Sequence, residues 1–267
     1  MTKSKVFIIV VLFCCFLFLH KTIAQDSTTA LKYFPQVTIL NTEVVKKNSS
    51  YNNEEYQIYI ALPYSYYDSS KTYPVLYITD ADGAFGSCTE ISRLFSLGGE
   101  IPEIIIVGIA YGISKGVSFN QYMYNRRRDY TPTTIDDDQS SGGAGKFLRF
   151  IQEDIIPYID KNYHTDQTSR AIAGASHGGL FVLYTLFHEV ELFNYYISIS
   201  PSLWWDNKVM FEFEQKYHEK NTDLPVKLFL SVGALEGSNG YIQPLKILTD
   251  IIKNRKYPSL IMNSIIL

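Results

Sequence analysis

A strand-like segment that leads directly into a helix-like one through a glycine-flanked serine constrains this chain more than any other feature. Residues 168–175, "TSRAIAGA", have the composition of a buried strand, and residues 178–189, "GGLFVLYTLFHE", have helical spacing. Between them Gly174, Ser176 and Gly178 fit the pattern G-x-S-x-G. In this context the glycines leave room for a strained turn that exposes the serine hydroxyl, and the next backbone N–H, that of His177, faces an oxyanion. We therefore predict that Ser176 is a nucleophile; the alternative is a serine in a turn of small residues.

Strand-like and helix-like segments alternate through the remainder of the chain. Two early segments separated by a polar turn predict an antiparallel pair of strands, and later apolar, β-branched runs predict strands buried on both faces. Strands that alternate with helices predict an α/β fold, with a mostly parallel central sheet, an antiparallel N-terminal edge and helices on both faces. Residues 111–145 predict a long polar loop. The predicted strands are 36–45, 55–63, 73–80, 103–110, 168–175, 195–200, 226–233 and 259–267, and the predicted helices are 88–102, 145–163, 178–189, 207–220 and 241–255.

The first 24 residues differ from the remainder of the chain. Lys3 and Lys5 precede the apolar run Val6–Leu19, and small residues follow near Ala24. This order is typical of a secretory signal peptide, and the run is short for a membrane span. We therefore expect residues 1–24 to be removed, residues 25–267 to form a single exported domain, periplasmic or secreted, and no stable membrane anchor to remain. The net charge of −3, with acidic and basic residues interspersed, argues against nucleic acid as a partner.

Several segments together resemble one protein family. They are "PVLYITDADGAFG", "RRRDYTPT", "GGAGKFLRFIQEDIIPYI", "IAGASHGGLFVLY", "ISPSLWW" and "LFLSVGALEG". In order and spacing they resemble the putative-esterase family of α/β hydrolases over roughly residues 35–267, and its siderophore-esterase-like branch most of all. The resemblance implies an α/β-hydrolase fold and an acyl-enzyme mechanism without a cofactor. It also implies a small-molecule ester substrate, such as a siderophore or carbohydrate ester.

The resemblance also implies roles for particular residues. Ser176 would be the nucleophile, and the backbone of His177 would supply one oxyanion donor. The second donor would come from the loop after the strand 73–80, at Gly83 and Ala84. The acid would be Glu236, which follows the strand 226–233, with Asp206 as the second choice because some α/β hydrolases place the acid one strand earlier.

Two pairs of large side chains are candidates for substrate binding. Trp204 and Trp205 would form a wall of the pocket, although both would serve equally as loop packing. Arg127 and Arg128 lie in the run "RRRD", which could attract an anionic substrate. A structural role, such as a pair with the neighbouring Asp129, is the expected alternative for at least one of these arginines.

A catalytic histidine is missing from the expected place. In this fold it lies after the last strand, and the chain stops at Leu267 within that strand. His20 lies in the predicted signal, and His164, His188 and His218 lie at positions unsuited to a base. The intact remainder of the site favours a chain that lacks the segment after its last strand over a degenerate, non-catalytic binding protein. The sequence leaves three functions open, namely an ester hydrolase, an acyltransferase and a ligand-binding module; it shows no Cys/His spacing for a metal and does not address oligomeric state.

Overall fold

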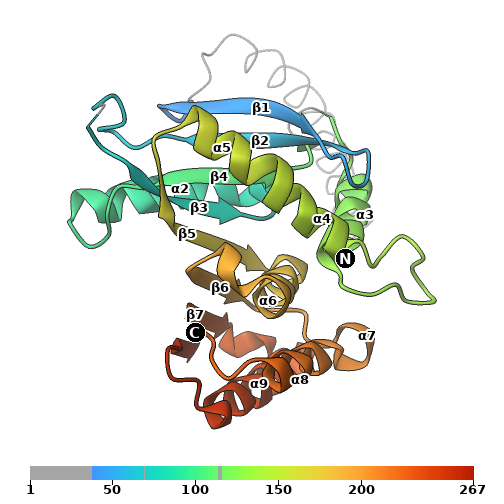
Figure 1. Ribbon diagram of the computed structural model, residues 1–267. Coiled ribbons are helices and arrows are strands. Elements are labelled where there is room, and N and C mark those ends of the chain that lie inside the picture. Colours follow the sequence, from blue (N-terminus) through green and yellow to red (C-terminus); the bar gives the residue numbers. More distant parts are fainter. Residues whose placement is uncertain (1–37, 69, 114–115) are drawn as a thin grey trace, which may run out of the picture. The chain divides into compact units, whose positions relative to one another are not determined.

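The computed structural model describes residues 38–68, 70–113 and 116–267. The predicted signal peptide lies outside these ranges. The fold is that of the compact unit Asn41–Leu267 (Figure 1). None of the helices within the described ranges has both the length and the apolar character needed to cross a membrane.

One eight-stranded sheet organises this unit, in the order β1-β2-β4-β3-β5-β6-β7-β8. The pairs β1/β2 and β2/β4 are antiparallel, and all the other pairs are parallel. Both the mostly parallel sheet and its antiparallel N-terminal edge are therefore confirmed. The strands are β1 (Thr42–Asn48), β2 (Glu55–Ala61), β3 (Tyr73–Ile78), β4 (Ile105–Ala110), β5 (Thr165–Ala175), β6 (Tyr195–Ile199), β7 (Lys227–Val232) and β8 (Ile261–Ile266).

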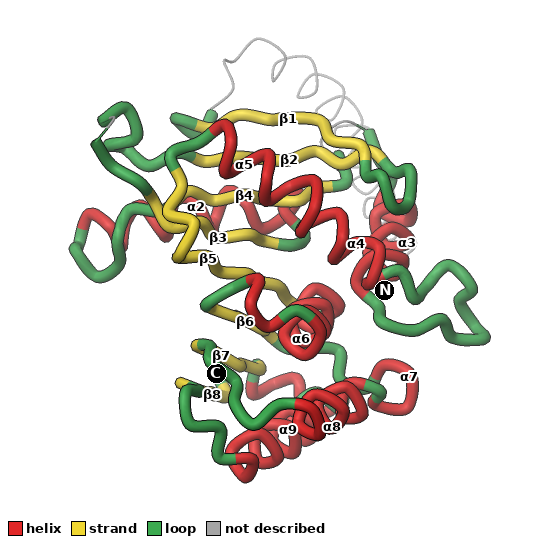
Figure 2. Tube along the Cα trace, viewed as in Figure 1, coloured by secondary structure: helices red, strands yellow, loops and turns green. Residues whose placement is uncertain are grey.

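Helices cover the two faces of this sheet unequally. On one face α2 packs through Ala81 and Phe85 against Ile78 and Ile106 of the sheet. The α4–α5 segment, α6, α8 and α9 pack with the residues of the opposite face in one large core; in Figure 2 α5 crosses in front of the sheet while α2 lies behind it. The helices are α2 (Ala81–Leu97), α3 (Phe119–Tyr130), α4 (Ala144–Arg149), α5 (Ile156–Asn162), α6 (His177–His188), α7 (Trp205–Lys208), α8 (Met210–Lys220) and α9 (Ile242–Arg255), with short η elements at Phe150–Ile155 (η3), Val190–Leu192 (η4) and Ala234–Asn239 (η5).

The prediction of a continuous polar loop over residues 111–145 is wrong, because α3 lies within it. The buried side chains of α3 are Asn125, Arg126, Asp129 and Tyr130. These side chains are polar or amphipathic, and their burial is compensated by hydrogen bonds and ion pairs in place of apolar contacts. Apolar periodicity, which is the main signal for a helix, is consequently absent from this segment.

The predicted helix 145–163 is interrupted near its proline. A π-helical turn, η3, separates α4 from α5, and Pro157 follows directly in the first turn of α5. Proline has no N–H to donate to the preceding turn, and its ring crowds the carbonyl four residues earlier. The resulting change in winding is the physical reason for the break.

Candidate active site

Ser176 occupies a strained turn between β5 and α6. Its φ of 57° and ψ of −119° lie outside the regions that L-residues ordinarily adopt. The Ser176 N–H donates to the carbonyl of Ile199 at 2.9 Å, and the Ser176 carbonyl accepts from the amides of Leu180 at 3.0 Å and Ser202 at 3.1 Å. The surrounding backbone therefore holds the strained conformation in place, as expected of a nucleophile turn.

The glycines around Ser176 are required by close backbone approach. A Cβ atom on Gly174 would lie 2.5 Å from the carbonyl carbon and oxygen of Gly178. A Cβ atom on Gly178 would lie 2.3 Å from Oγ1 of Thr79 and 3.3 Å from Oδ2 of Asp80. The turn that follows β3 therefore packs directly against the serine turn, which brings two sources of backbone amides together.

The two amides predicted to be the second oxyanion donor already have an acceptor in the structure. The amides of Gly83 and Ala84 donate to the carbonyl of Asp80 at 3.0 and 3.1 Å, within the first turn of α2. The sequence prediction began this helix at residue 88, but it begins at Ala81. The amides of Ala81 and Asp82 are the ones that find no acceptor among the described residues, because the first N–H groups of a helix have no partner within it.

Glu236 lies in η5, just beyond the carboxyl end of β7. Its Oε1 accepts hydrogen bonds from the amide of Gly233 at 2.9 Å and from Oγ of Ser200 at 2.7 Å. Ser200 follows β6, the strand next to β5, so Glu236 is held at the same edge of the sheet as Ser176. The alternative acid, Asp206, lies in α7 with a positive φ of 40°, and its carboxylate has no partner among the described residues.

The His177 ring is buried against the edges or faces of both tryptophans. It is 8% exposed, its ring centroid lies 5.8 Å from that of Trp204 and 5.6 Å from that of Trp205, and neither ring nitrogen has a partner among the described residues. Burial, together with the nearby positive charges of Arg126 and Arg127, lowers the pKa of His177 to about 4. The ring is therefore neutral near pH 7.

The two tryptophans have different environments. Trp205 is 3% exposed, and its Nε1–H donates to the carbonyl and hydroxyl oxygens of Thr133 at 3.3 and 3.2 Å. Trp204 is 44% exposed. Trp205 thus packs against the loop between α3 and α4 that contains Thr133, whereas Trp204 has exposed surface that a substrate could contact.

None of the described histidines is hydrogen-bonded to the Ser176 hydroxyl. Among the described residues, the only side-chain atom within hydrogen-bonding distance of this hydroxyl is Oγ of Ser202, at 3.4 Å. The ring of His164 stacks on Tyr66 before β5, and that of His188 stacks on Tyr184 at the end of α6. His218 lies on α8 against Tyr257. The general base is therefore unassigned within the described part of the chain, and no cluster of His, Cys, Asp or Glu there could hold a metal ion.

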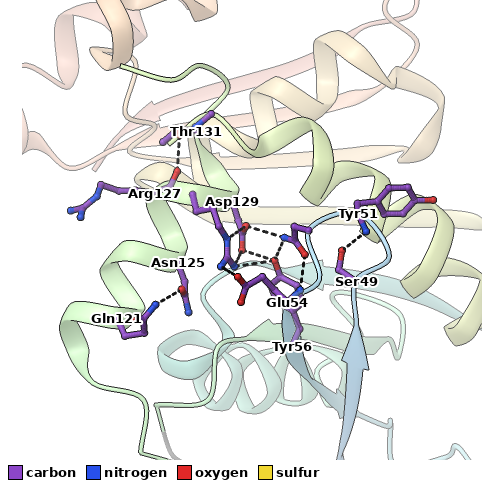
Figure 3. A network of polar contacts seen from close by, with 12 residues as sticks. Ser49, Tyr51, Glu54, Tyr56, Gln121, Asn125, Arg127, Asp129 and Thr131 are labelled. Atoms are coloured by element: carbon purple, nitrogen blue, oxygen red, sulfur yellow. Dashed lines mark hydrogen bonds and ion pairs between the residues drawn. The ribbon is translucent and has the colours of Figure 1, made fainter. Parts of the chain in front are cut away.

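The three consecutive arginines of α3 make separate ion pairs. Arg128 donates through Nε and Nη2 to Asp129 at 2.7 and 2.9 Å and through Nη1 to Glu54 at 2.7 Å. Figure 3 shows the network of polar contacts around Asp129, Glu54 and Tyr56. Arg126 pairs with Asp80. Arg127 pairs with Asp138 at 2.7 Å, with 40% of its side chain exposed. Arg128 thus has the structural role that the sequence analysis gave as the alternative, a pair with Asp129. Arg127 remains the candidate for substrate contact.

The strand order and the strained serine at the carboxyl end of a central parallel strand together define an α/β hydrolase. The chain belongs to the family described as "Putative esterase", whose model matches residues 49–266.

Named relatives place the chain within this family. It is 34% identical over 217 residues to the ferri-bacillibactin esterase BesA of Bacillus subtilis, covering 74% of this chain and 72% of the relative. It is 31% identical over 193 residues to the siderophore triacetylfusarinine C esterase of Aspergillus fumigatus, covering 65% of this chain and 62% of the relative. The crystal structure of BES protein from Bacillus cereus superposes with a TM-score of 0.77 at 31% identity, covering 87% of this chain and 89% of that one. The protein is therefore an esterase of the siderophore-esterase-like branch.

Proposed function

We propose that this protein is an exported serine hydrolase that cleaves ester bonds of a siderophore through an acyl-enzyme on Ser176. The observation that carries the proposal is the conformation of Ser176, a strained residue between two helix N-termini whose first amides find no acceptor among the described residues. The names of the siderophore-esterase relatives support the substrate class. Export rests on the predicted signal peptide alone.

The chemistry follows from the arrangement of these groups. Ser176 Oγ attacks the ester carbonyl as its proton passes to a base, and the carbonyl oxygen becomes an oxyanion held by the amides of His177 and Ala81. Collapse of this tetrahedral intermediate expels the protonated alcohol and leaves an acyl group on Ser176. Water then attacks the acyl-enzyme by the reverse sequence, releasing the carboxylic acid and the free serine.

The remaining residues have supporting roles in this proposal. Glu236, oriented by Ser200 and the amide of Gly233, would stabilise the cationic form of a histidine base. The exposed face of Trp204 would pack against an aromatic or acyl portion of the substrate, and Arg127 would attract its negative charge. The base itself is assigned to none of the four described histidines.

Labelling with a fluorophosphonate tests the nucleophile. The wild-type protein should react once per chain, and Ser176→Ala should abolish the reaction. Ser202→Ala is the matched control, because Ser202 places a hydroxyl 3.4 Å from Ser176 Oγ without belonging to the turn. Labelling of Ser176→Ala at the wild-type rate would refute the proposal, and a wild-type protein that neither reacts nor hydrolyses esters would favour a ligand-binding module.

Imidazole in the assay buffer tests the assignment of the base. If none of the described histidines serves, free imidazole should raise hydrolysis of a 4-nitrophenyl ester. It should recover part of the about 10²–10⁴-fold that a positioned base contributes. The same experiment with Ser176→Ala measures the direct reaction of imidazole with the ester, and this background rate is subtracted from the rate of the wild type. Glu236→Gln should reduce the rescued rate and Asp206→Asn should not; the reverse result would transfer the acid role to Asp206.

A further inference from the structure

Asp80 forms the turn between β3 and α2 with a left-handed backbone. Its φ of 54° and ψ of 37° are uncommon for a residue with a side chain. The next residue, Ala81, begins α2, so the backbone angles of Asp80 set the direction in which the Ala81 amide points. Oδ2 of Asp80 also lies 3.3 Å from the position that a Cβ on Gly178 would take, so this turn touches the Ser176 turn.

Three residues of α3 hold Asp80, and they follow one another at intervals of four. Arg126 donates from Nε to Oδ1 at 2.6 Å and from Nη2 to Oδ2 at 2.9 Å. Tyr122 donates its hydroxyl to Oδ1 at 3.0 Å, and the amide of Asp80 donates to the hydroxyl of Tyr130 at 3.1 Å. Residues at this spacing share one face of a helix, so α3 presents a single clamp to the turn.

The clamp is rigid and sheltered. The side chains of Arg126 and Asp80 are 10% and 16% exposed, and the Arg126 guanidinium lies 5.6 and 5.9 Å from the ring centroids of Tyr122 and Tyr130. A two-point arginine–carboxylate bond fixes orientation as well as distance, which a lysine cannot do. The next turn of backbone is anchored separately, because the Asp82 carboxylate accepts from the amides of Tyr111 and Gly112 at 2.6 and 3.0 Å.

We propose that Arg126 is a positioning residue that, through Asp80, aims the Ala81 amide at the substrate oxyanion. Arg126 need not touch the substrate in this role. The inference rests on the proposed serine mechanism, and it assigns to the "RRRD" run a function other than attraction of an anionic substrate. Because an oxyanion donor acts on the transition state more than on the bound substrate, a misdirected amide lowers the chemical rate with little effect on binding.

The test separates the rate of reaction at Ser176 from binding. Fluorophosphonate labelling at several concentrations gives kinact and KI for the wild type, Arg126→Lys and Tyr122→Phe. Loss of one oxyanion donor costs about 10²–10³-fold. We expect Arg126→Lys to lower kinact by at least about tenfold with KI within about twofold, and Tyr122→Phe to lower kinact by a smaller factor.

Arg170→Lys is the matched control. Arg170 pairs with Asp160 with side-chain exposures of 18% and 14%, and it lies six residues before Ser176 along β5, about 20 Å away. The Arg170→Lys substitution should lower the thermal midpoint and leave kinact unchanged. A folded Arg126→Lys and a folded Tyr122→Phe that both keep kinact within twofold of wild type would overturn the positioning role alone, as would an equal loss of kinact in Arg170→Lys. Absence of wild-type labelling would instead overturn the serine mechanism, and the positioning role with it.

Discussion

The close approach of backbone at Gly174 leads to a quantitative prediction. In Gly174→Ala the new Cβ would lie 2.5 Å from the carbonyl carbon and oxygen of Gly178 and 2.6 Å from Oγ1 of Thr79. Two of these three atoms are backbone at the start of α6, so no rotation of a side chain relieves the contact. Overpacking of this kind costs about 1–3 kcal/mol, and we expect the upper end of that range because the backbone must shift.

The effect is measurable as a change in thermal midpoint. For a domain of this size each kcal/mol shifts the midpoint by about 2–4 °C, so Gly174→Ala should melt about 6–12 °C below wild type. Gly83→Ala is the control, because Gly83 lies in α2 and a Cβ there meets nothing within 4 Å. This helix position should gain up to about 1 kcal/mol from alanine and melt slightly above wild type. If Gly174→Ala melts within 2 °C of wild type, the glycine is not required by packing and the reasoning fails.

Two further predictions concern buried ionisable groups. His177 has a pKa of about 4 in the folded protein against about 6.5 in the unfolded chain. Between these two pH values only the unfolded chain binds the proton, so the free energy of unfolding falls as the pH is lowered, by roughly 3 kcal/mol in all. The free energy of unfolding, measured by urea titration, should fall between pH 7 and pH 4.5 in the wild type by more than it does in His177→Phe. An equal fall in the two proteins would contradict the prediction. Asp129→Asn removes the buried carboxylate partner of Arg128, leaves it only the partly exposed Glu54, and should cost about 3–5 kcal/mol by urea denaturation. Glu55→Gln, at the exposed pair with Lys46, should cost less than about 1 kcal/mol, and equal losses in the two variants would refute the distinction between buried and exposed pairs.

Much of the fold could be predicted from the sequence, because periodicity and turn chemistry are local properties. The four parallel strands from β5 onward were each predicted from a short apolar run, and α6, α8 and α9 from helical spacing. The helix α3 could not be predicted in this way, since its buried face consists of paired polar groups whose partners lie elsewhere in the chain. Arg128, for example, is paired with Glu54, and three strands (β2, β3 and β4) lie between these two residues in the sequence.

The candidate site divides along the same line. Gly174, Ser176 and Gly178 are close in sequence, so a strand–turn–helix pattern is enough to indicate a strained serine, and the structure shows that strain. The position of Glu236 after β7 was also predicted, while its role stays a prediction. The roles of Trp204 and Trp205 could not be separated without knowing which of them is buried.

What the sequence by itself determined is therefore the strained serine turn, the alternation of strands and helices, and the family to which they belong. Tertiary structure alone decided which amides of the turn after β3 find no acceptor in the described part of the chain, since that depends on α2 beginning at Ala81. It also decided the use of the three arginines, because Asp80 and Arg126 are 46 residues apart and meet only once β3 and α3 are folded. Local pattern specifies backbone conformation, but the partner of a buried charge is set by the packing of distant elements.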